Sequence, residues 1–305
     1  TMIQTLAAVD IGTNTILLTI AGRLPDDRSL TVIKDEHSIA RLGQGVDSLR
    51  RIQEDAILRA ESILLKYKEL CDSLAVDSIR AVGTSCLRDA ANRDEVCHRL
   101  SQTLGARVEV ISGDEEARLC FLGSIEDDFP TTIVDIGGGS TELISGKNGA
   151  IEYRTSIDIG AVRLTERYFK ELPPSKENIF LANHEIHQAL SIVPRDALYA
   201  IRAVAGTPTT LAAMILKLSE FAPEAIHNYQ LMYNDVELMG SMLTQLSLEK
   251  ILLLPGVHPK RADILPAGVL ILKSILEYAS ASHCTVSTKG LRYGVLQDMI
   301  LPHIN

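Results

Sequence analysis

Residues 133–144, IVDIGGGSTELI, combine groups that could handle phosphate together with a cation. An apolar run typical of a buried strand end precedes three consecutive glycines, which allow a turn that presents bare N–H groups to an anion. Carboxylates repel phosphate unless a cation stands between them, so the flanking acids favour bound Mg²⁺ or Mn²⁺. The residues concerned are Gly137, Gly138, Gly139, Ser140 and Thr141, with the acids Asp135 and Glu142. A glycine hairpin is the alternative, but this composition is poor hairpin chemistry compared with Asn-Gly.

The same pattern recurs near the N-terminus in AVDIGTNTILL, residues 8–18. At an offset of 125 residues, the motif positions Asp135, Gly137, Gly138, Gly139 and Ser140 correspond to Asp10, Gly12, Thr13, Asn14 and Thr15. A second pair of segments, AVGTS at 81–85 and VAGT at 204–207, matches at an offset of 123. Two anchors at nearly one offset indicate an internal duplication. We therefore predict two similar domains that each offer one phosphate loop to a shared cleft.

The composition is that of an ordinary globular protein and argues against nucleic acid and membranes as partners. Of 305 residues, 46% are hydrophobic and 23% are charged, and the net charge is −9. The chain has no Trp and only 4% aromatic residues, which argues against the stacking platforms of nucleic-acid binders. The five cysteines form no CxxC pair, and no apolar run is long enough to span a membrane. With no signal peptide in view, we expect a cytoplasmic protein that binds neither nucleic acid nor membrane; a homodimer is one alternative that the sequence leaves open.

Apolar periodicity predicts that each half begins with strands and then alternates helix and strand. The elements expected in the first half are strands over 3–11, 15–22 and 30–39, a turn at 25–27, and helices over 51–74 and 85–104. Ser112 with Glu115 has the spacing of a capping box that starts the next helix. A polar break near Glu126 separates the halves. The fold class is α/β, with domains at 1–125 and 126–305, and the second carries the larger helical elaboration, including a last helix over 290–301.

Six motifs in order along the chain carry a more specific resemblance. They are GTSCLRDAANRDE at 83–95, SGDEEARL at 112–119, DIGGGSTEL at 135–143, VAGTPTTLA at 204–212, PKRADILPAGVLIL at 259–272 and STKGLRYGVL at 287–296. The paired Asp-x-Gly loops resemble those of the actin, Hsp70 and sugar-kinase superfamily. With the six motifs, the whole chain resembles the exopolyphosphatase and guanosine pentaphosphate phosphatase family. This resemblance implies two similar actin-like (ribonuclease H-like) domains with mixed sheets flanked by helices, and an active site in the interdomain cleft.

The resemblance also implies roles for single residues. Carried over by position, it makes Glu116 the group that activates the attacking water, with Glu142 as its partner near the metal. Hydrolysis of a phosphoanhydride needs a water in line, cations that absorb charge, and a carboxylate within reach of the water. The acids of the two loops, Asp10, Asp135 and Glu142, are the predicted ligands of Mg²⁺ (or Mn²⁺). Acids in a first helical turn are also good capping residues, and we prefer that role for Glu115.

Phosphate contacts are predicted from the loops and from one arginine near a helix start. Arg88 could reach phosphate through two N–H groups, whereas Arg93 could do so or pair with a neighbouring aspartate. The predicted phosphate-binding residues are Gly12, Thr13, Asn14, Thr15, Arg88, Gly137, Gly138, Gly139, Ser140, Gly206 and Thr207. Gly206 and Thr207 match a superfamily loop that meets adenosine in nucleotide-binding relatives, although Ala205 and Pro208 depart from its usual pattern. Arg261 and Arg292 stay open between phosphate contacts and salt bridges on helix surfaces.

These inferences predict an exopolyphosphatase that hydrolyses the terminal phosphoanhydride of linear polyphosphate by direct attack of water and releases orthophosphate. The same motifs would serve a guanosine pentaphosphate 5′-phosphohydrolase, which is the alternative among enzymes. A nucleotide-switched ATPase would need an adenosine pocket, and a non-catalytic polyphosphate sensor would not need both Glu116 and Glu142. Long family members carry a further C-terminal helical domain, whereas this sequence ends at Asn305. We therefore expect distributive hydrolysis of long chains.

Overall fold

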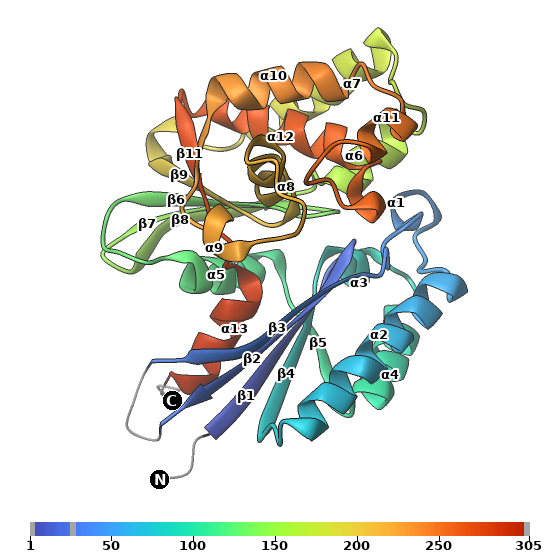
Figure 1. Cartoon of the computed structure of the whole chain (residues 1–305), viewed down its shortest axis with the longest axis vertical. Helices are drawn as coiled ribbons and strands as arrows, with labels where there is room; N and C mark the ends of the chain where they lie inside the picture. The colour runs from blue at the N-terminus through green and yellow to red at the C-terminus, as the bar shows by residue number, and fades with distance from the viewer. Residues whose placement is uncertain (1–3, 25–28, 302–305) are drawn as a thin grey trace. The chain divides into compact units, whose positions relative to one another are not determined.

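A computed structural model describes residues 4–24 and 29–301, which form two compact units (Figure 1). The first unit comprises Thr1–Gly123 and Leu291–Asn305, and the second comprises Ser124–Gly290. The division after Gly123 lies close to the predicted one at 125/126. The turn predicted at 25–27 lies outside the described residues, as does Ile3 at the start of the first predicted strand. None of the helices in the described ranges combines the length and apolarity that crossing a bilayer requires.

The first unit is built on a five-stranded mixed sheet in the order β3-β2-β1-β4-β5. Its strands are β1 (Gln4–Ile11), β2 (Thr15–Arg23), β3 (Thr31–Ile39), β4 (Ser78–Gly83) and β5 (Val108–Val110). Its helices are α1 (Val46–Leu49), α2 (Glu54–Ser73), α3 (Ser85–Asp89), α4 (Arg93–Leu104), α5 (Gly113–Ser124) and α13 (Leu291–Ile300). β1 to β3 form an antiparallel meander, and β4 and β5 join it in parallel pairing.

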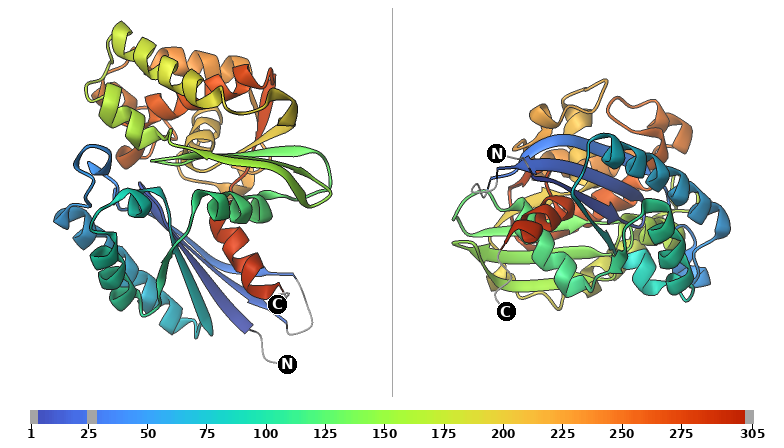
Figure 2. Two further views of the ribbon diagram at one scale, coloured as in Figure 1. Left: turned by 180° about the vertical axis from the view of Figure 1, so that it is seen from behind. Right: turned by 90° about the horizontal axis from the view of Figure 1, so that it is seen from below.

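Helices cover both faces of this sheet (Figures 1 and 2). On one face, alternate residues of the strands pack with the apolar stripes of α2 and α4, which include Ala60, Leu64 and Leu100. On the other face, Leu119 of α5 and Val295 of α13 pack with the remaining strand residues. This second layer fixes the start of α5, which carries the predicted catalytic Glu116.

The second unit contains a six-stranded sheet in the order β10-β11-β9-β6-β7-β8. Its strands are β6 (Thr131–Ile136), β7 (Thr141–Lys147), β8 (Ala150–Ile157), β9 (Ala200–Val204), β10 (Gln230–Met232) and β11 (His283–Val286). Its helices are α6 (Ala161–Tyr168), α7 (Lys176–Leu190), α8 (Gly206–Ile215), α9 (Pro223–Ile226), α10 (Tyr233–Leu243), α11 (Leu248–Leu252) and α12 (Leu265–Tyr278), with 3-10 turns η1 (Arg195–Ala197) and η2 (Pro259–Arg261). Strand β10 and the short helices α9 and α11 were not among the predicted elements.

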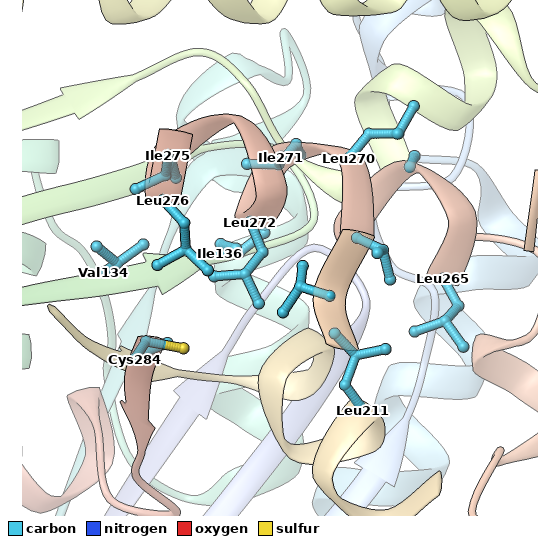
Figure 3. Packing of buried hydrophobic residues seen from close by; sticks show 14 of the residues in the cluster. Val134, Ile136, Leu211, Leu265, Leu270, Ile271, Leu272, Ile275, Leu276 and Cys284 are labelled. Carbon is cyan, nitrogen blue, oxygen red and sulfur yellow. The ribbon is translucent and has the colours of Figure 1, made fainter. Parts of the chain in front are cut away.

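Helix α12 is the central core element of the second unit (Figure 3). It is apolar around almost its whole circumference, and its residues from Leu265 to Leu272 are all buried. A helix of this kind is stable only when neighbours cover every side. Leu272 and Leu276 pack in the same cluster as Val134 of β6 and Leu211 of α8. The strand that precedes the glycine loop is therefore held by α12 from within its own unit.

The two units repeat one topology, which confirms the predicted duplication. In each, an antiparallel meander is extended by a parallel strand beside its first strand. The pairing of Ile11 with Ile16 at the end of β1 recurs as the pairing of Ile136 with Thr141. The predicted fold class, α/β with two mixed sheets flanked by helices, is confirmed.

Two predicted elements differ from the structure. The helix expected over 85–104 is interrupted between α3 and α4, because the amide of Asn92 binds both the N–H and the carbonyl of Ile52 at 3.0 Å. The last helix, α13, belongs to the first unit and not to the predicted domain 126–305. Its Arg292, 5% exposed, donates to Asp35 of β3 at 2.9 Å. Contacts between residues this distant in sequence override the local pattern.

Candidate active site

The loops after β1 and β6 have one geometry. The N–H of Gly12 donates to the carbonyl of Thr15 at 2.9 Å, and the N–H of Gly137 donates to the carbonyl of Ser140 at 3.0 Å. Each bond closes a tight turn across the loop. A Cβ on Gly137 would lie 3.0 Å from that carbonyl oxygen, so a side chain has little room there.

The carbonyl groups of both loops are bonded to the protein, and their inner N–H groups are not. In the second unit, Ala161 and Val162 at the start of α6 donate to the carbonyls of Gly137 and Gly138 at 2.9 Å. In the first unit, the carbonyls of Thr13 and Asn14 accept from Gly43, Ala40 and Arg41. Within residues 4–24 and 29–301, no acceptor is found for the N–H groups of Thr13, Asn14, Gly138, Gly139 and Ser140. Successive N–H groups without an acceptor in a tight turn are the feature that forms an anion cradle.

The acids of the second loop lie side by side. Asp135 and Glu142 are directly opposite across β6 and β7, and Glu142 is opposite Ser156 of β8. The hydroxyl of Ser156 donates to Glu142 Oε1 at 2.7 Å, and Glu142 is 1% exposed. Two carboxylates therefore end adjacent strands directly beside the cradle.

A third loop joins β9 to α8 next to the glycine loop, since Asp135 pairs with Val204 across the parallel strands. Ala205 has φ 73° and ψ −165°, a conformation that favours glycine, and the helix begins at Gly206. A Cβ on Gly206 would lie 1.3 Å from Nη1 of Arg261, so the guanidinium lies directly against this loop. Ile264 packs on Val162 at the start of α6, which brings the Arg261 segment to the cradle as well.

Arg261 places a positive charge beside the loop between β9 and α8. In the part of the chain that the structure describes, its side chain has neither a hydrogen-bond acceptor nor an acidic partner. Burial lowers the pKa of its guanidinium to about 10, so the side chain is still charged at neutral pH. An unpaired, partly buried cation beside N–H donors favours a bound anion.

In the first unit, three strand ends lie in register. Ile11, Gly83 and Val110 pair across β1, β4 and β5, so the segments after them start side by side. Arg88 of α3 donates from Nη1 to Glu116 Oε2 at 2.5 Å and to the carbonyl of Ile111 at 3.1 Å. Glu116, in the first turn of α5, is 7% exposed. The predicted base and the predicted phosphate-binding arginine are therefore an ion pair.

The donor set of the second unit suits a hard divalent cation. Asp135 and Glu142 supply carboxylate oxygens, the ligands that Mg²⁺ prefers, and Mg²⁺ is commonly held by one or two carboxylates plus substrate phosphates. Within the described ranges, no group of three or more His, Cys, Asp or Glu side chains is arranged to hold a metal alone. Asp10, the third predicted ligand, lies in the other unit. The predicted metal ligands stay a prediction.

Comparison with known proteins identifies the family of this chain. A sequence model of the Ppx/GppA phosphatase family matches residues 23–303. The chain belongs to the Ppx/GppA phosphatase family. Exopolyphosphatase 2 of Mycobacterium tuberculosis is 33% identical over 314 residues, which cover 95% of this chain and 96% of that protein. A bifunctional 3-dehydroquinate synthase/phosphatase of Fusobacterium nucleatum is 32% identical over 96% of this chain and 46% of that protein.

Solved Ppx/GppA structures have the same fold. An exopolyphosphatase-like protein matches with a TM-score of 0.91 and 29% identity, covering 97% of this chain and 98% of that one. The family member from Aquifex aeolicus matches with a TM-score of 0.82 and 32% identity over 100% of both chains. The family resemblance predicted from the six motifs is confirmed, and with it a hydrolase that acts on phosphoanhydrides.

Several alternatives left open by the sequence are now decided. Arg93 is exposed and lies 3.6 Å from Asp94, as one alternative expected. Arg292 forms a buried ion pair and not a surface one. Ser112 caps α5 by accepting from the N–H of Glu115, but the Glu115 side chain pairs with Arg118 and does not complete a capping box.

Two supporting residues had no signal in the sequence. Arg163, 6% exposed, donates from Nε to the carbonyl of Gly139 at 2.7 Å and so fixes the last glycine of the loop. Ser156 orients Glu142 from the neighbouring strand. Both act across strand or helix contacts that no local motif encodes.

Proposed function

We propose that this chain is an exopolyphosphatase that removes terminal orthophosphate from linear polyphosphate. The observation that carries the proposal is the ion pair of Arg88 and Glu116 on the edge that also carries the cradle of Thr13 and Asn14. It combines a buried carboxylate, a cation and phosphate-binding N–H groups within one unit. Hydrolysis of a phosphoanhydride requires these parts.

The side chains and N–H groups of the loops that follow the strands in each unit favour polyphosphate over a nucleotide. The donors without a partner in the described ranges include backbone N–H groups of both loops and the guanidinium of Arg261, and all of these suit phosphate oxygens. In the described loops 12–15, 84–92, 137–140 and 205–208, no residue is aromatic, so they offer no platform for stacking a base. A chain of phosphates presents the same oxygens at every repeat. The relative from M. tuberculosis, which matches over nearly its whole length, is named an exopolyphosphatase.

In the proposed reaction, Glu116 accepts a proton from a water while the water oxygen forms a bond to the terminal phosphorus. The bond from that phosphorus to the bridging oxygen breaks, and the shortened polyphosphate leaves with the electron pair. In the first unit, the N–H groups of Thr13 and Asn14 and the guanidinium of Arg88 are the donors for phosphate oxygens; in the second unit, the N–H groups of the glycine loop and Arg261 are donors of the same kind. Bound at Asp135 and Glu142, Mg²⁺ (or Mn²⁺) would supply neutralisation of the charge on the phosphates. The interdomain cleft and the cytoplasmic location stay predictions.

Phosphate release from polyphosphate, guanosine pentaphosphate and ATP, measured side by side at equal concentration with Mg²⁺, tests the proposal. We expect the highest kcat/KM on polyphosphate and no release after EDTA, with recovery when Mg²⁺ or Mn²⁺ is added back. A higher kcat/KM on guanosine pentaphosphate would assign the alternative substrate. Release that persists in EDTA would contradict the metal requirement.

A further inference from the structure

The glycine loop after β6 lies on the first turn of α6. The N–H of Ala161 donates to the carbonyl of Gly137 at 2.9 Å. The N–H groups of Val162 and Arg163 both donate to the carbonyl of Gly138, at 2.9 and 3.0 Å. The first N–H groups of an α-helix have no partner within the helix, and here the loop supplies the acceptors.

The side chain of Arg163 adds a positive charge to the same contact. Its Nε donates to the carbonyl of Gly139 at 2.7 Å, and the residue is 6% exposed. A guanidinium stays protonated in proteins, and a hydrogen bond from a charged donor is roughly twice as strong as one between neutral groups. Three successive carbonyls of the loop therefore accept bonds from a helix start and from a buried cation.

These bonds also act on the N–H groups of the loop. Each carbonyl belongs to the same planar, conjugated peptide group as the N–H of the next residue. A donor at the carbonyl draws electron density from the nitrogen and makes that N–H a stronger donor, by about 10–30% for each bond in a chain. The N–H groups concerned are those of Gly138, Gly139 and Ser140, for which no acceptor is found within the described ranges.

The charges around the loop show what this polarisation does for an anion. Asp135 and Glu142 lie opposite each other at the ends of β6 and β7, directly before and after the loop, and both repel phosphate. The start of α6 carries about half an elementary positive charge, and Arg163 adds a full one. Both positive charges act through the carbonyls of the loop, so they favour an anion at its N–H groups.

The first phosphate loop has a different backing. Its carbonyls, on Thr13 and Asn14, accept from the backbone N–H groups of Gly43, Ala40 and Arg41, and none of these three residues begins a helix. The two loops therefore share a tight turn but differ in the groups that bind their carbonyls. The combination of a helix start with a guanidinium belongs to the second loop.

We infer that Arg163 and the first turn of α6 set the strength of the second loop as a phosphate site, because they polarise its N–H groups through the carbonyls. The inference rests on the proposed function. It makes Arg163 a positioning residue: its Nε binds the protein backbone, and its effect reaches the phosphate through the peptide group of Gly139 and Ser140.

Orthophosphate titration of ¹⁵N-labelled protein, followed at the amide resonances of Gly138, Gly139 and Ser140, tests the inference. Arg163→Gln keeps an N–H donor but removes the charge, so the orthophosphate Kd at these resonances should rise about tenfold. Arg163→Lys keeps the charge and should stay within about threefold of the parent protein. A parent-like Kd in Arg163→Gln would overturn the inference, because the guanidinium would then only hold the loop in place.

The matched control is Arg167→Gln on the same helix. Arg167 lies one turn after Arg163 and pairs with Glu185 of α7, so its loss removes an equal charge but no bond to the loop. The orthophosphate Kd should be unchanged in this variant. An equal loss of affinity in Arg167→Gln and Arg163→Gln would refute polarisation through the loop, since any charge on α6 would then have the same effect.

Gly160→Ala tests the helix start separately, and it decides the question if Arg163→Gln does not fold. A Cβ on Gly160 would lie 2.3 Å from the carbonyl oxygen of Gly138 and 2.5 Å from the nitrogen of Gly139, so the loop and α6 must separate. The orthophosphate Kd should again rise about tenfold, although Arg163 is retained. An unchanged Kd would exclude the role of α6.

This readout needs no turnover, so it separates the inference from the proposed function. A parent protein whose three loop resonances respond to orthophosphate, but which releases no phosphate from polyphosphate, would reject only the proposed function. Loop resonances that do not respond to orthophosphate in the parent protein would reject the inference.

Discussion

Ala205 has a backbone conformation that residues with a Cβ rarely adopt. Its φ of 73° and ψ of −165° lie in a region essentially reserved for glycine, which costs a residue with a Cβ about 1–3 kcal/mol. Ala205→Gly removes this cost, whereas the added freedom of the unfolded chain takes back about 0.5–1 kcal/mol. The net expectation is a gain of about 1 kcal/mol in the free energy of unfolding. Equilibrium urea unfolding, followed by circular dichroism, measures it.

The matched control is Ala212→Gly in α8, the helix that follows Ala205. Ala212 is fully buried in the interior of α8, where glycine should cost about 1 kcal/mol in propensity and more for the lost methyl group. The two substitutions should therefore change the free energy of unfolding in opposite directions, although both replace alanine by glycine. Phosphate release should be unchanged in Ala205→Gly, because the N–H of Gly206 keeps its direction. A loss of stability in Ala205→Gly would refute the strained conformation of this loop.

Two further predictions concern buried charges. Burial of Glu126 opposes its ionisation, but Lys289 at 2.7 Å and His227 at 2.9 Å outweigh burial and lower its pKa to about 2. The ionised Glu126 contributes at most about 3 kcal/mol to the free energy of unfolding, fully above about pH 4.5 and less as the pH falls towards 2. The difference in the free energy of unfolding between the parent protein and Glu126→Gln should therefore shrink over this window. A difference that is constant from pH 7 to 2.5 would contradict the lowered pKa. Arg292→Met should destabilise the first unit by about 3 kcal/mol, because Asp35 loses its guanidinium partner and keeps only the hydroxyls of Thr19 and Tyr293 and nearby His37. Adding Asp35→Asn should recover part of the loss. Strict additivity of the two changes, measured by urea unfolding, would exclude their coupling.

The parts of the site that depend on local sequence were predictable. The turn at 137–140 follows from glycine spacing alone, and the matching bond at Gly12 follows from the repeat at an offset of 125. Each needs only neighbouring residues to form.

The parts that depend on distant contacts were not predictable. Arg261 is separated from Gly206 by the whole segment from α8 to η2, and only packing of the second unit brings its guanidinium to that loop. The break between α3 and α4 depends on Asn92 and Ile52, and the place of α13 depends on Arg292 and Asp35. Polar and charged residues that pair across the fold are distant in sequence, so their pairing produces no periodicity or motif that could be recognised locally.

The central claim is that Glu116 is the base of a phosphate-binding site, and the Glu116→Gln variant tests it most directly. The change keeps the shape of the side chain and removes its ability to accept a proton. Phosphate release from polyphosphate should fall by about 100-fold or more, while polyphosphate affinity stays within about tenfold of the parent protein. Unchanged phosphate release in a folded Glu116→Gln protein would contradict the assignment of the base.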